Sequence, residues 1–232
     1  MSGIITENLN MILNKIDESA SLSGRDPKGI TLVGVTKTVD ADRIRQLLSL
    51  GVRHLGENRV QEFLTKYPVL SSVENKPVWH MIGHLQTNKV KPIMDKVSLI
   101  HSVDSLRLAN EIGKHAIRLG IIMNVLVEIN AAGELSKSGV SFNEARELVK
   151  SLSGIGGVLC RGLMTVPPYA EDGESNRDYF KKMKDALEEM NEAGINETPM
   201  DILSMGMTSD YEAAIQEGAT IIRVGTGIFG SR

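Results

Sequence analysis

The chain has 232 residues, a hydrophobic content of 41% and a formal net charge of −3 at pH 7. This nearly balanced charge excludes a broad basic face, so we expect no nucleic-acid partner. No stretch approaches the ~20 apolar residues of a membrane span, and the first residues lack the pattern of a signal peptide, so we expect no membrane partner. Cys160 is the single cysteine, which excludes a disulfide framework and favours a reducing, cytoplasmic location.

The first half of the chain alternates between helix and strand patterns. Apolar residues at helical spacing in residues 3–20 predict an amphipathic helix ahead of the first strand. The apolar, β-branched run at 30–36 predicts that strand. Further strands are predicted at 52–56, 78–82, 98–102 and 123–129. Helices between them are predicted at 40–50, from 57–59 onward, at 87–94 and at 104–119. Pro92 is expected to shorten or kink the third of these helices.

The second half continues the same alternation. Asp104 is predicted to cap the helix at 104–119, and Gly120 to end it. Ser141 and Glu144 have the spacing of a capping box at the start of the next helix. The remaining strands are predicted at 157–164, 200–204 and 219–224, and the remaining helices at 141–152, 175–193 and 211–216.

Strands that alternate with helices predict a parallel sheet. Eight such units in a chain of this length favour one closed (β/α)8 TIM barrel, a fold of ~250 residues, over a doubly wound sheet. We expect a single domain, 1–232, with an N-terminal helix in 1–24 and the barrel in 30–232. Almost nothing follows the last strand, so the N-terminal helix is expected to take the place of the missing last helix.

The residues that can bind a ligand or take part in a reaction lie at the carboxyl ends of the predicted strands. Active sites of such barrels lie at the carboxyl ends of the strands, and the loops after the seventh and eighth strands commonly bind phosphate. Glycines there allow backbone N–H groups to approach an anion. The strand ends supply an amine, amides, hydroxyls, an arginine and glycine-rich loops, at Lys37, 56–58, 83–86, 164–165, 204–209 and 223–227.

Lys37 closes the first strand and has two interpretations. Most lysines at strand ends are solvated, with the stem along the sheet and the ammonium in water. The alternative is a partly desolvated lysine whose neutral amine forms a Schiff base. An amine, a phosphate cradle and an arginine at one barrel mouth match bound pyridoxal 5'-phosphate (PLP). A sugar-phosphate aldolase with a Schiff-base lysine would need some of the same groups.

Two further motifs fail the test of their context. Gly225, Gly227 and Gly230 form a literal GxGxxG, but only two residues follow, so the βαβ unit of a dinucleotide site is missing. A structural turn or a phosphate loop remains. His80 and His84 lie in a strand-to-loop segment without a third ligand, which argues against zinc. We expect His80 in the core or the pocket wall, and no metal site.

Six segments together resemble the pyridoxal phosphate homeostasis protein family, also called proline synthase co-transcribed homologues. The resemblance extends over essentially the whole chain. The segments are VTKT at 35–38, HLGENRVQE at 54–62, WHMIGHLQTNK at 79–89, LM at 163–164, LSMGMTSD at 203–210 and RVGTGIFG at 223–230. The resemblance implies the barrel of fold-type III PLP proteins, like the N-terminal domain of alanine racemase.

The resemblance also implies roles for individual residues. Lys37 forms the internal aldimine with PLP, and Asn58 lies beside the cofactor ring. Arg223 faces the pyridine nitrogen, and because an arginine cannot accept a proton, the nitrogen is expected to stay unprotonated. The phosphate is placed on Ser204, Gly225 and Thr226 with neighbouring backbone amides.

The implied function is PLP homeostasis, in which the protein buffers the cofactor and supplies it to PLP-acceptor apoenzymes, with no robust catalytic activity expected. The alternative is a fold-type III amino-acid racemase of limited activity, which would need a second base near the ring. Tyr169 and Tyr211 are candidates for that base, although ordinary pocket or surface tyrosines are the simpler interpretation. We expect a monomer, because no catalytic residue from a second subunit is required.

Overall fold

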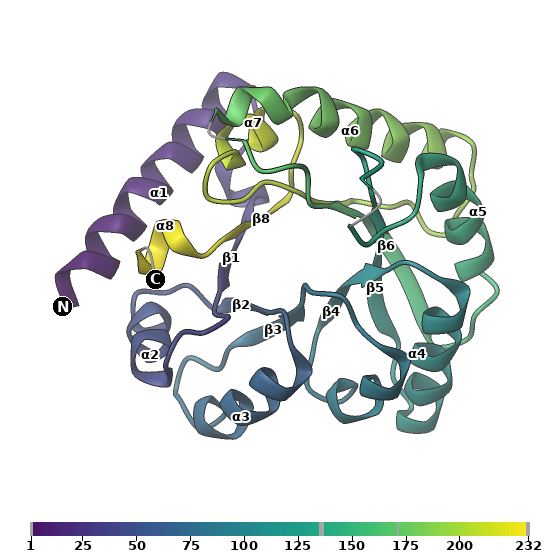
Figure 1. Ribbon diagram of the computed structural model, residues 1–232, viewed down its shortest axis with the longest axis horizontal. Helices are drawn as coiled ribbons and strands as arrows, with labels where there is room; N and C mark the ends of the chain where they lie inside the picture. The colour runs from purple at the N-terminus through teal and green to yellow at the C-terminus, as the bar shows by residue number, and fades with distance from the viewer. Residues whose placement is uncertain (1, 135–136, 171, 231–232) are drawn as a thin grey trace.

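A closed barrel of eight parallel strands forms the centre of the molecule (Figure 1). The computed structural model of the protein describes residues 2–134, 137–170 and 172–230. Each strand pairs with the next along the chain, and β1 closes the barrel on β8. The strands are β1 (Thr31–Val35), β2 (His54–Glu57), β3 (Val78–Met81), β4 (Leu99–Val103), β5 (Met123–Ile129), β6 (Val158–Thr165), β7 (Ile202–Ser204) and β8 (Ile221–Val224). The predicted (β/α)8 fold is confirmed.

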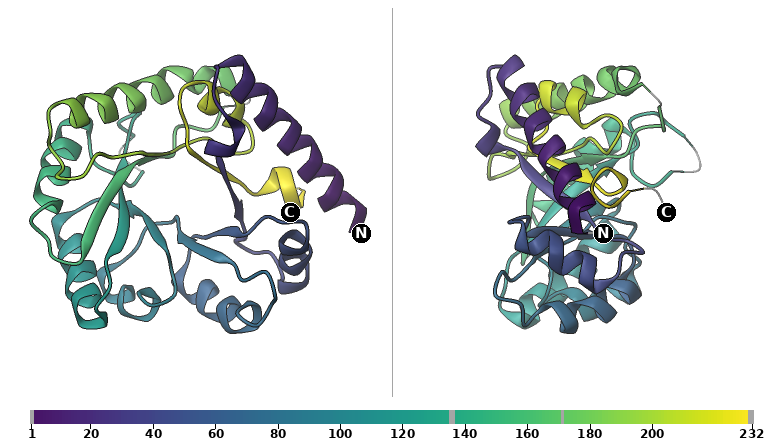
Figure 2. Two further views of the ribbon diagram at one scale, coloured as in Figure 1. Left: turned by 180° about the vertical axis from the view of Figure 1, so that it is seen from behind. Right: turned by 90° about the vertical axis from the view of Figure 1, so that its left-hand side faces the viewer.

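Helices surround the barrel on the outside (Figures 1 and 2). The α-helices are α1 (Ser2–Leu22), α2 (Ala41–Ser49), α3 (Val60–Leu70), α4 (Leu106–Leu119), α5 (Phe142–Leu152), α6 (Arg177–Glu192), α7 (Tyr211–Gln216) and α8 (Thr226–Phe229). The 3₁₀ turns are η1 (Pro27–Gly29), η2 (Thr87–Lys89), η3 (Lys91–Ile93) and η4 (Gly173–Asn176). Within the described residues, no helix is both long and apolar enough to cross a membrane.

Helix α1 covers the position that a full-length helix after β8 would occupy, as predicted, because the helix that does follow β8, α8, has only four residues. It packs against α2, α7 and α8 at the seam between β1 and β8 (Figure 1). The Asn8 side-chain amide donates to the carbonyl of Ile228 at 3.1 Å, which ties α1 to the C-terminal segment. The short helix α8 itself was not predicted, because four residues are too few to give a periodic pattern.

Three local predictions differ from the structure. The segment 87–94 forms η2 and η3 in place of a helix, because Pro92 has no N–H for the ladder and disfavours helical geometry in the residue before it. The cap of α4 is Ser105, whose Oγ accepts from Leu108 N at 3.4 Å, and not Asp104. The helix predicted at 175–193 is divided into η4 and α6.

Other start and stop signals were predicted correctly. Gly120 ends α4 with a φ of 65°, the left-handed region that glycine enters without steric cost. Ser141 caps α5 in a capping box: the Ser141 Oγ accepts from Glu144 N at 3.3 Å, and a Glu144 carboxylate oxygen accepts from Ser141 N at 2.8 Å.

Two apolar cores hold the barrel together. The larger core lies between the strands and the surrounding helices. The smaller one fills the interior of the barrel with the buried side chains of Val33, Leu99, Leu126, Met164 and Ile221. The barrel is therefore a packed body and not a pore, and its polar chemistry is confined to the carboxyl mouth and to one line of interior polar side chains described below.

Candidate functional site

A cavity of about 350 Å³ opens at the carboxyl ends of β1 and β8. It is lined by Val35, Lys37, Tyr169, Met207, Thr208, Ser209, Arg223, Gly225 and Thr226. Four residues predicted from the sequence, Lys37, Arg223, Gly225 and Thr226, therefore meet on its wall. This is the mouth of the barrel, where enzymes of this fold carry their active sites.

Lys37 lies in a tight turn directly after β1. The turn is closed by a hydrogen bond from Val39 N to the carbonyl of Thr36 at 2.9 Å. Thr38 has a φ of 61°, and it is the one non-glycine residue of the described segments in this left-handed region. A β-branched residue adopts that conformation at a cost, and such strain is held at functional sites by the surrounding structure.

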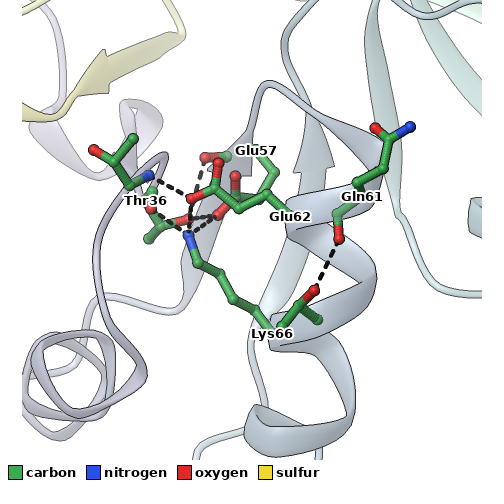
Figure 3. Close-up of polar contacts among 8 residues, drawn as sticks. Thr36, Glu57, Gln61, Glu62 and Lys66 are labelled. Atoms are coloured by element: carbon green, nitrogen blue, oxygen red, sulfur yellow. Dashed lines mark hydrogen bonds and ion pairs between the residues drawn. The ribbon is translucent and has the colours of Figure 1, made fainter.

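Lys66 on α3 anchors the turn that presents Lys37 (Figure 3). Its buried ammonium donates to the carbonyl of Thr36 at 2.5 Å, to Glu57 Oε1 at 2.7 Å and to Glu62 Oε1 at 2.6 Å. These three bonds use the three N–H donors of an ammonium. Glu62 also accepts the backbone N–H of Thr38. The peptide groups on both sides of Lys37 are thus fixed by one ion pair.

Glu57 is the second acid of this network and is fully buried. Its Oε1 accepts from the Thr36 hydroxyl at 2.6 Å as well as from Lys66, while its Oε2 is buried without a partner among the described residues. Burial raises the pKa of Glu57, and the hydrogen bonds from Lys66 and Thr36 oppose that rise. At Glu62 burial also acts to raise the pKa, but the bonds from Lys66 and Thr38 outweigh it and the pKa is lowered.

Arg223 is held rigidly inside the barrel at the floor of the cavity. One terminal nitrogen donates to the Ser204 Oγ at 2.6 Å, and the other donates to the carbonyl of Thr165 at 2.8 Å. Burial lowers the pKa of Arg223 to about 10, and the acids Asp210 and Glu128 act against that shift. The guanidinium therefore stays charged at neutral pH and can only donate hydrogen bonds.

Ser204, which the resemblance places at the phosphate, is not among the residues that line this cavity. It is fully buried beneath Arg223. The loop beyond it carries Thr208 and Ser209 to the wall. The Thr208 Oγ1 lies 3.1 Å from the Thr226 Oγ1 and accepts from Gly227 N at 3.1 Å. The hydroxyls that can meet an anion beside Gly225 are therefore on these later residues.

Asn58, the remaining predicted residue, lies after β2 and outside the set that lines the cavity. Its Oδ1 is buried and has no partner among the described residues, so it retains a free acceptor. Its backbone packs against Gly83, where a Cβ would come 2.4 Å from the Asn58 carbonyl oxygen. The position of Asn58 is therefore fixed by close backbone contact.

The two histidines of the H-x3-H pair lie in different environments, one buried and one exposed. His80 is buried in the barrel interior between His54 and His101. His84 is exposed and its Nδ1 lies 3.3 Å from a carboxylate oxygen of Asp104. Within the described residues, no group of three or more His, Cys, Asp or Glu side chains could hold a metal ion.

Several site residues were missed by reasoning from the sequence. The spacing of Glu62 and Lys66 on α3 was a readable signal, because residues four apart share a helix face. Glu57 and Lys66 carry no such signal, since they meet only through the packing of α3 on β2. Glu128 on β5 was also missed: it is buried, its Oε2 has no described partner, and burial raises its pKa to about 7, with Asp104 adding to the rise and Arg223 opposing it.

Fold and site together define a (β/α)8 barrel in which Lys37, whose flanking peptide groups are held by hydrogen bonds, and the charged Arg223 line one cavity at the carboxyl mouth. The sequence profile of the family described as "alanine racemase, N-terminal domain" matches residues 9–232. The pyridoxal phosphate homeostasis protein of Aquifex aeolicus is 43% identical over 226 residues, which cover 97% of each chain. That of Escherichia coli K12 is 35% identical over 231 residues, 98% of this chain and 97% of its own. The chain belongs to the pyridoxal phosphate homeostasis protein family.

Solved structures agree with this assignment. PipY of Synechococcus elongatus PCC7942, solved with PLP bound, has a TM-score of 0.81 and 34% identity over 93% of this chain and 100% of its own. A protein from Bifidobacterium adolescentis has a TM-score of 0.89 at 34% identity, over 98% of this chain and 95% of its own. Alanine racemase of Clostridium difficile 630 shares the fold alone, with a TM-score of 0.71 and 19% identity over 99% of this chain and 57% of that chain.

Proposed function

We propose that this protein binds PLP in the cavity between Lys37 and Arg223 and that it serves PLP homeostasis by holding and supplying the cofactor. The observation that carries the proposal is that one cavity is lined by Lys37, by the buried and charged Arg223 and by loops that contain hydroxyls and glycine. The relatives' names and the PLP-bound PipY structure support it.

The residues around the cavity fit the cofactor. A Cβ on Gly225 would come 3.2 Å from the Cβ of Val35, and one on Gly227 would come 3.1 Å from the Thr208 Cγ2. These two glycines therefore bring their backbone close to the cavity wall, as a phosphate cradle requires. The fixed donors of Arg223 supply polar contacts expected for a heteroaromatic ring.

Each residue has a distinct role in this proposal. When bound, PLP supplies an aldehyde that condenses with a lysine amine. Lys37 is the point of covalent attachment, and the network of Lys66 fixes its backbone. Thr208, Ser209 and Thr226 offer hydroxyls to the phosphate, and Gly225 offers its backbone. Arg223 faces the ring nitrogen as a donor, which leaves that nitrogen without a proton.

The test is the visible absorption spectrum of purified protein with added PLP, before and after borohydride reduction, followed by peptide mass mapping. A visible band that bleaches and leaves a pyridoxyl group on Lys37 is expected. Lys37→Ala should lose the band, whereas Lys184→Ala, on the exposed face of α6, should keep it. A wild-type protein that takes up no PLP, or a pyridoxyl group found only elsewhere, would contradict the proposal.

A limited amino-acid racemase is the second candidate, because Tyr169 lines the cavity. Tyr169 is 83% exposed, whereas Arg223 is buried and held by two hydrogen bonds. Tyr211, the other candidate base, is buried and lies outside the cavity-lining set. Exchange of the α-proton of amino acids for deuterium, lost in Tyr169→Phe, would establish the racemase. If the PLP-loaded protein catalyses no exchange, the carrier role remains the proposed function.

We further propose that the protein acts as a cytoplasmic monomer that passes PLP to acceptor apoenzymes. The exposed Tyr169 leaves the cavity accessible at the barrel mouth, and Cys160 is a buried free thiol, as suits a reducing compartment. Light scattering should give the mass of one chain. Mixing the PLP-loaded protein with an apoenzyme should restore the enzyme's activity faster than the spontaneous release of PLP allows.

A further inference from the structure

Three histidines form a continuous hydrogen-bonded line inside the barrel and end at Arg223. The Nδ1 of His54 on β2 lies 2.9 Å from the Nε2 of His80 on β3. The Nδ1 of His80 lies 2.9 Å from the Nε2 of His101 on β4. The Nδ1 of His101 lies 2.8 Å from the Oγ of Ser204 on β7, which accepts from Arg223 on β8 at 2.6 Å. The line runs from the amino end of β2 to the floor of the cavity.

The chemistry of Arg223 determines the direction of every bond in this line. A guanidinium has only donors, so the Ser204 Oγ must accept from it. Among the described contacts of the Ser204 Oγ, only the Nδ1 of His101 can accept its single hydroxyl proton, so we assign that proton to the bond with His101 and Nδ1 as the acceptor. A neutral imidazole that accepts at Nδ1 carries its proton on Nε2, so His101 donates to His80. By the same logic His80 donates to His54.

Burial keeps the histidines in the neutral form that this order requires. His101 is fully buried and His80 is 4% exposed. Burial lowers the pKa of His80 to about 3, with the neighbouring His54 adding to the effect. Burial, His80 and Arg223 together lower the pKa of His101 well below its usual value. An added proton would oppose two donors along the line: at His80 its Nδ1–H would face the Nε2–H of His101, and at His101 its Nδ1–H would face the hydroxyl proton of Ser204.

The other charged groups around the line act on its ends. Arg53 adds to the effect of burial in lowering the pKa of His54, which is half-buried at the amino end. At the other end, Glu128 and Asp210 act on Arg223 and favour its charge. No carboxylate of the described residues is hydrogen-bonded to His80 or His101. The middle of the line therefore has no partner that would favour an imidazolium.

Packing alone does not explain a polar line through an otherwise apolar interior. The barrel interior around it is filled by Val33, Leu99, Leu126 and Met164. Apolar side chains of similar volume would fill the same space without the desolvation cost of three imidazoles. A fully satisfied buried network instead specifies one arrangement of its members. Its terminal member here is the arginine of the proposed cofactor site.

We propose that His80 and His101 are positioning residues for Arg223. The ordered line keeps the Ser204 hydroxyl proton away from Arg223, so the serine is always available as an acceptor. This locks one arm of the guanidinium, and the bond to Thr165 locks the other. Arg223 then meets the ring nitrogen of the cofactor in one orientation. The positioning role rests on the proposed PLP site, whereas the order of the protons does not.

The proton order is tested on the wild-type protein without PLP. Nitrogen-15 NMR of the histidine rings at pH 7 distinguishes the two neutral tautomers and the imidazolium. His54, His80 and His101 are expected to be neutral with the proton on Nε2. A proton on Nδ1, or an imidazolium, in any of these three rings would overturn the inference. This measurement needs no variant and does not depend on cofactor binding.

The positioning role is tested by comparing PLP with its 1-deaza analogue, which lacks the ring nitrogen. His80→Phe and Ser204→Ala each break the line. Each should weaken the binding of PLP about tenfold and leave the binding of the analogue within twofold of wild type. His115→Phe, which removes a buried histidine of α4 outside the barrel, should change neither.

The outcomes separate this inference from the proposed function. Wild-type protein that binds no PLP would contradict the proposed function. The NMR test of the histidine tautomers would not be affected, because it is made without PLP. Variants that weaken PLP and the analogue equally would reduce the line to a structural element and overturn the positioning role. Should His80→Phe fail to fold, Ser204→Ala, which removes only an oxygen, carries the same comparison.

Discussion

At the scale of single residues, the site depends on how the backbone of Lys37 is held rather than on the lysine alone. Thr36 and Thr38 flank it, and both are bonded to the cluster of Lys66, Glu57 and Glu62 (Figure 3). Buried charges are costly unless they are paired, so the three members of the cluster depend on one another. Changes in the cluster should therefore reach the cofactor through the turn.

Lys66→Met tests this dependence. The substitution preserves much of the volume but leaves the fully buried Glu57 without its cation, so we expect a loss of stability of about 3–5 kcal/mol. PLP binding should also weaken, because the carbonyl of Thr36 loses its donor. Urea unfolding and a PLP titration measure the two effects. Lys184→Met, whose ammonium lies 3.8 Å from Glu188 on the surface, should change neither, and equal effects in both variants would exclude the proposed anchor.

Thr38→Gly tests whether the turn is strained. Thr38 has a φ of 61°, so glycine should relieve steric strain and raise the stability by about 1 kcal/mol, less the entropic cost of glycine in the unfolded chain. Thermal unfolding gives the sign. Thr198→Gly, the same substitution at an exposed position without positive φ, should be neutral or destabilising. A loss of stability in Thr38→Gly as large as that in Thr198→Gly would show that the turn is not strained.

At the scale of elements, the sequence located the strands well and the deepest side chains poorly. β5 was predicted with its observed bounds because most of its residues are apolar, with two valines and an isoleucine that favour strand. The strand ends also predicted Lys37, Arg223, Gly225 and Thr226 as site residues, and these four line one cavity. Ser204, which was also predicted from a strand end, is hydrogen-bonded to His101 and Arg223 in the barrel interior, because a strand end fixes where the backbone stops and not which way its last side chain points.

Gly227→Ala tests the packing of α8 against the loop after β7. A Cβ there would come 2.9 Å from the Val224 Cγ1 and 3.1 Å from the Thr208 Cγ2. The added methyl group should displace Thr208, cost about 1–3 kcal/mol of stability and weaken PLP binding. Gly29→Ala, which meets nothing within 4 Å, is the matched control. An unchanged PLP affinity in Gly227→Ala would remove Thr208 from the phosphate site.

At the scale of the whole molecule, a line of polar side chains in the barrel interior connects the amino end of β2 with the cavity at the carboxyl mouth. An apolar core supports the strands, and the histidine line crosses it from β2 to β8. The sequence could not indicate this line, since its three histidines are far apart in the chain and meet through the pairing of β2, β3 and β4, while Ser204 on β7 meets His101 across the barrel interior. A closed barrel therefore carries a feature that no single strand or helix contains, and that feature should affect the stability of the whole.

The dependence of stability on pH follows from the neutral histidines. Their pKa values are lowered in the folded state, to about 3 for His80, against about 6.5 in the unfolded chain. Below pH 6.5 the unfolded chain therefore binds more protons than the folded protein does. As a result, the free energy of unfolding decreases as the pH is lowered. Each histidine that stays neutral should cost about 2 kcal/mol between pH 7.5 and pH 5. Glu128 acts in the opposite sense, because burial raises its folded pKa to about 7.

His80→Phe isolates this contribution by urea unfolding at pH 7.5, 6 and 5. The variant lacks one buried imidazole and interrupts the line, so its stability should fall less steeply with pH than that of the wild type, by at least about 2 kcal/mol over this range. Glu128 is common to both proteins, so its opposing contribution cancels in the difference. His115→Phe should keep the steep wild-type dependence. Parallel curves for wild type and His80→Phe would mean that His80 accepts protons in the folded barrel, and the ordered line could not then exist.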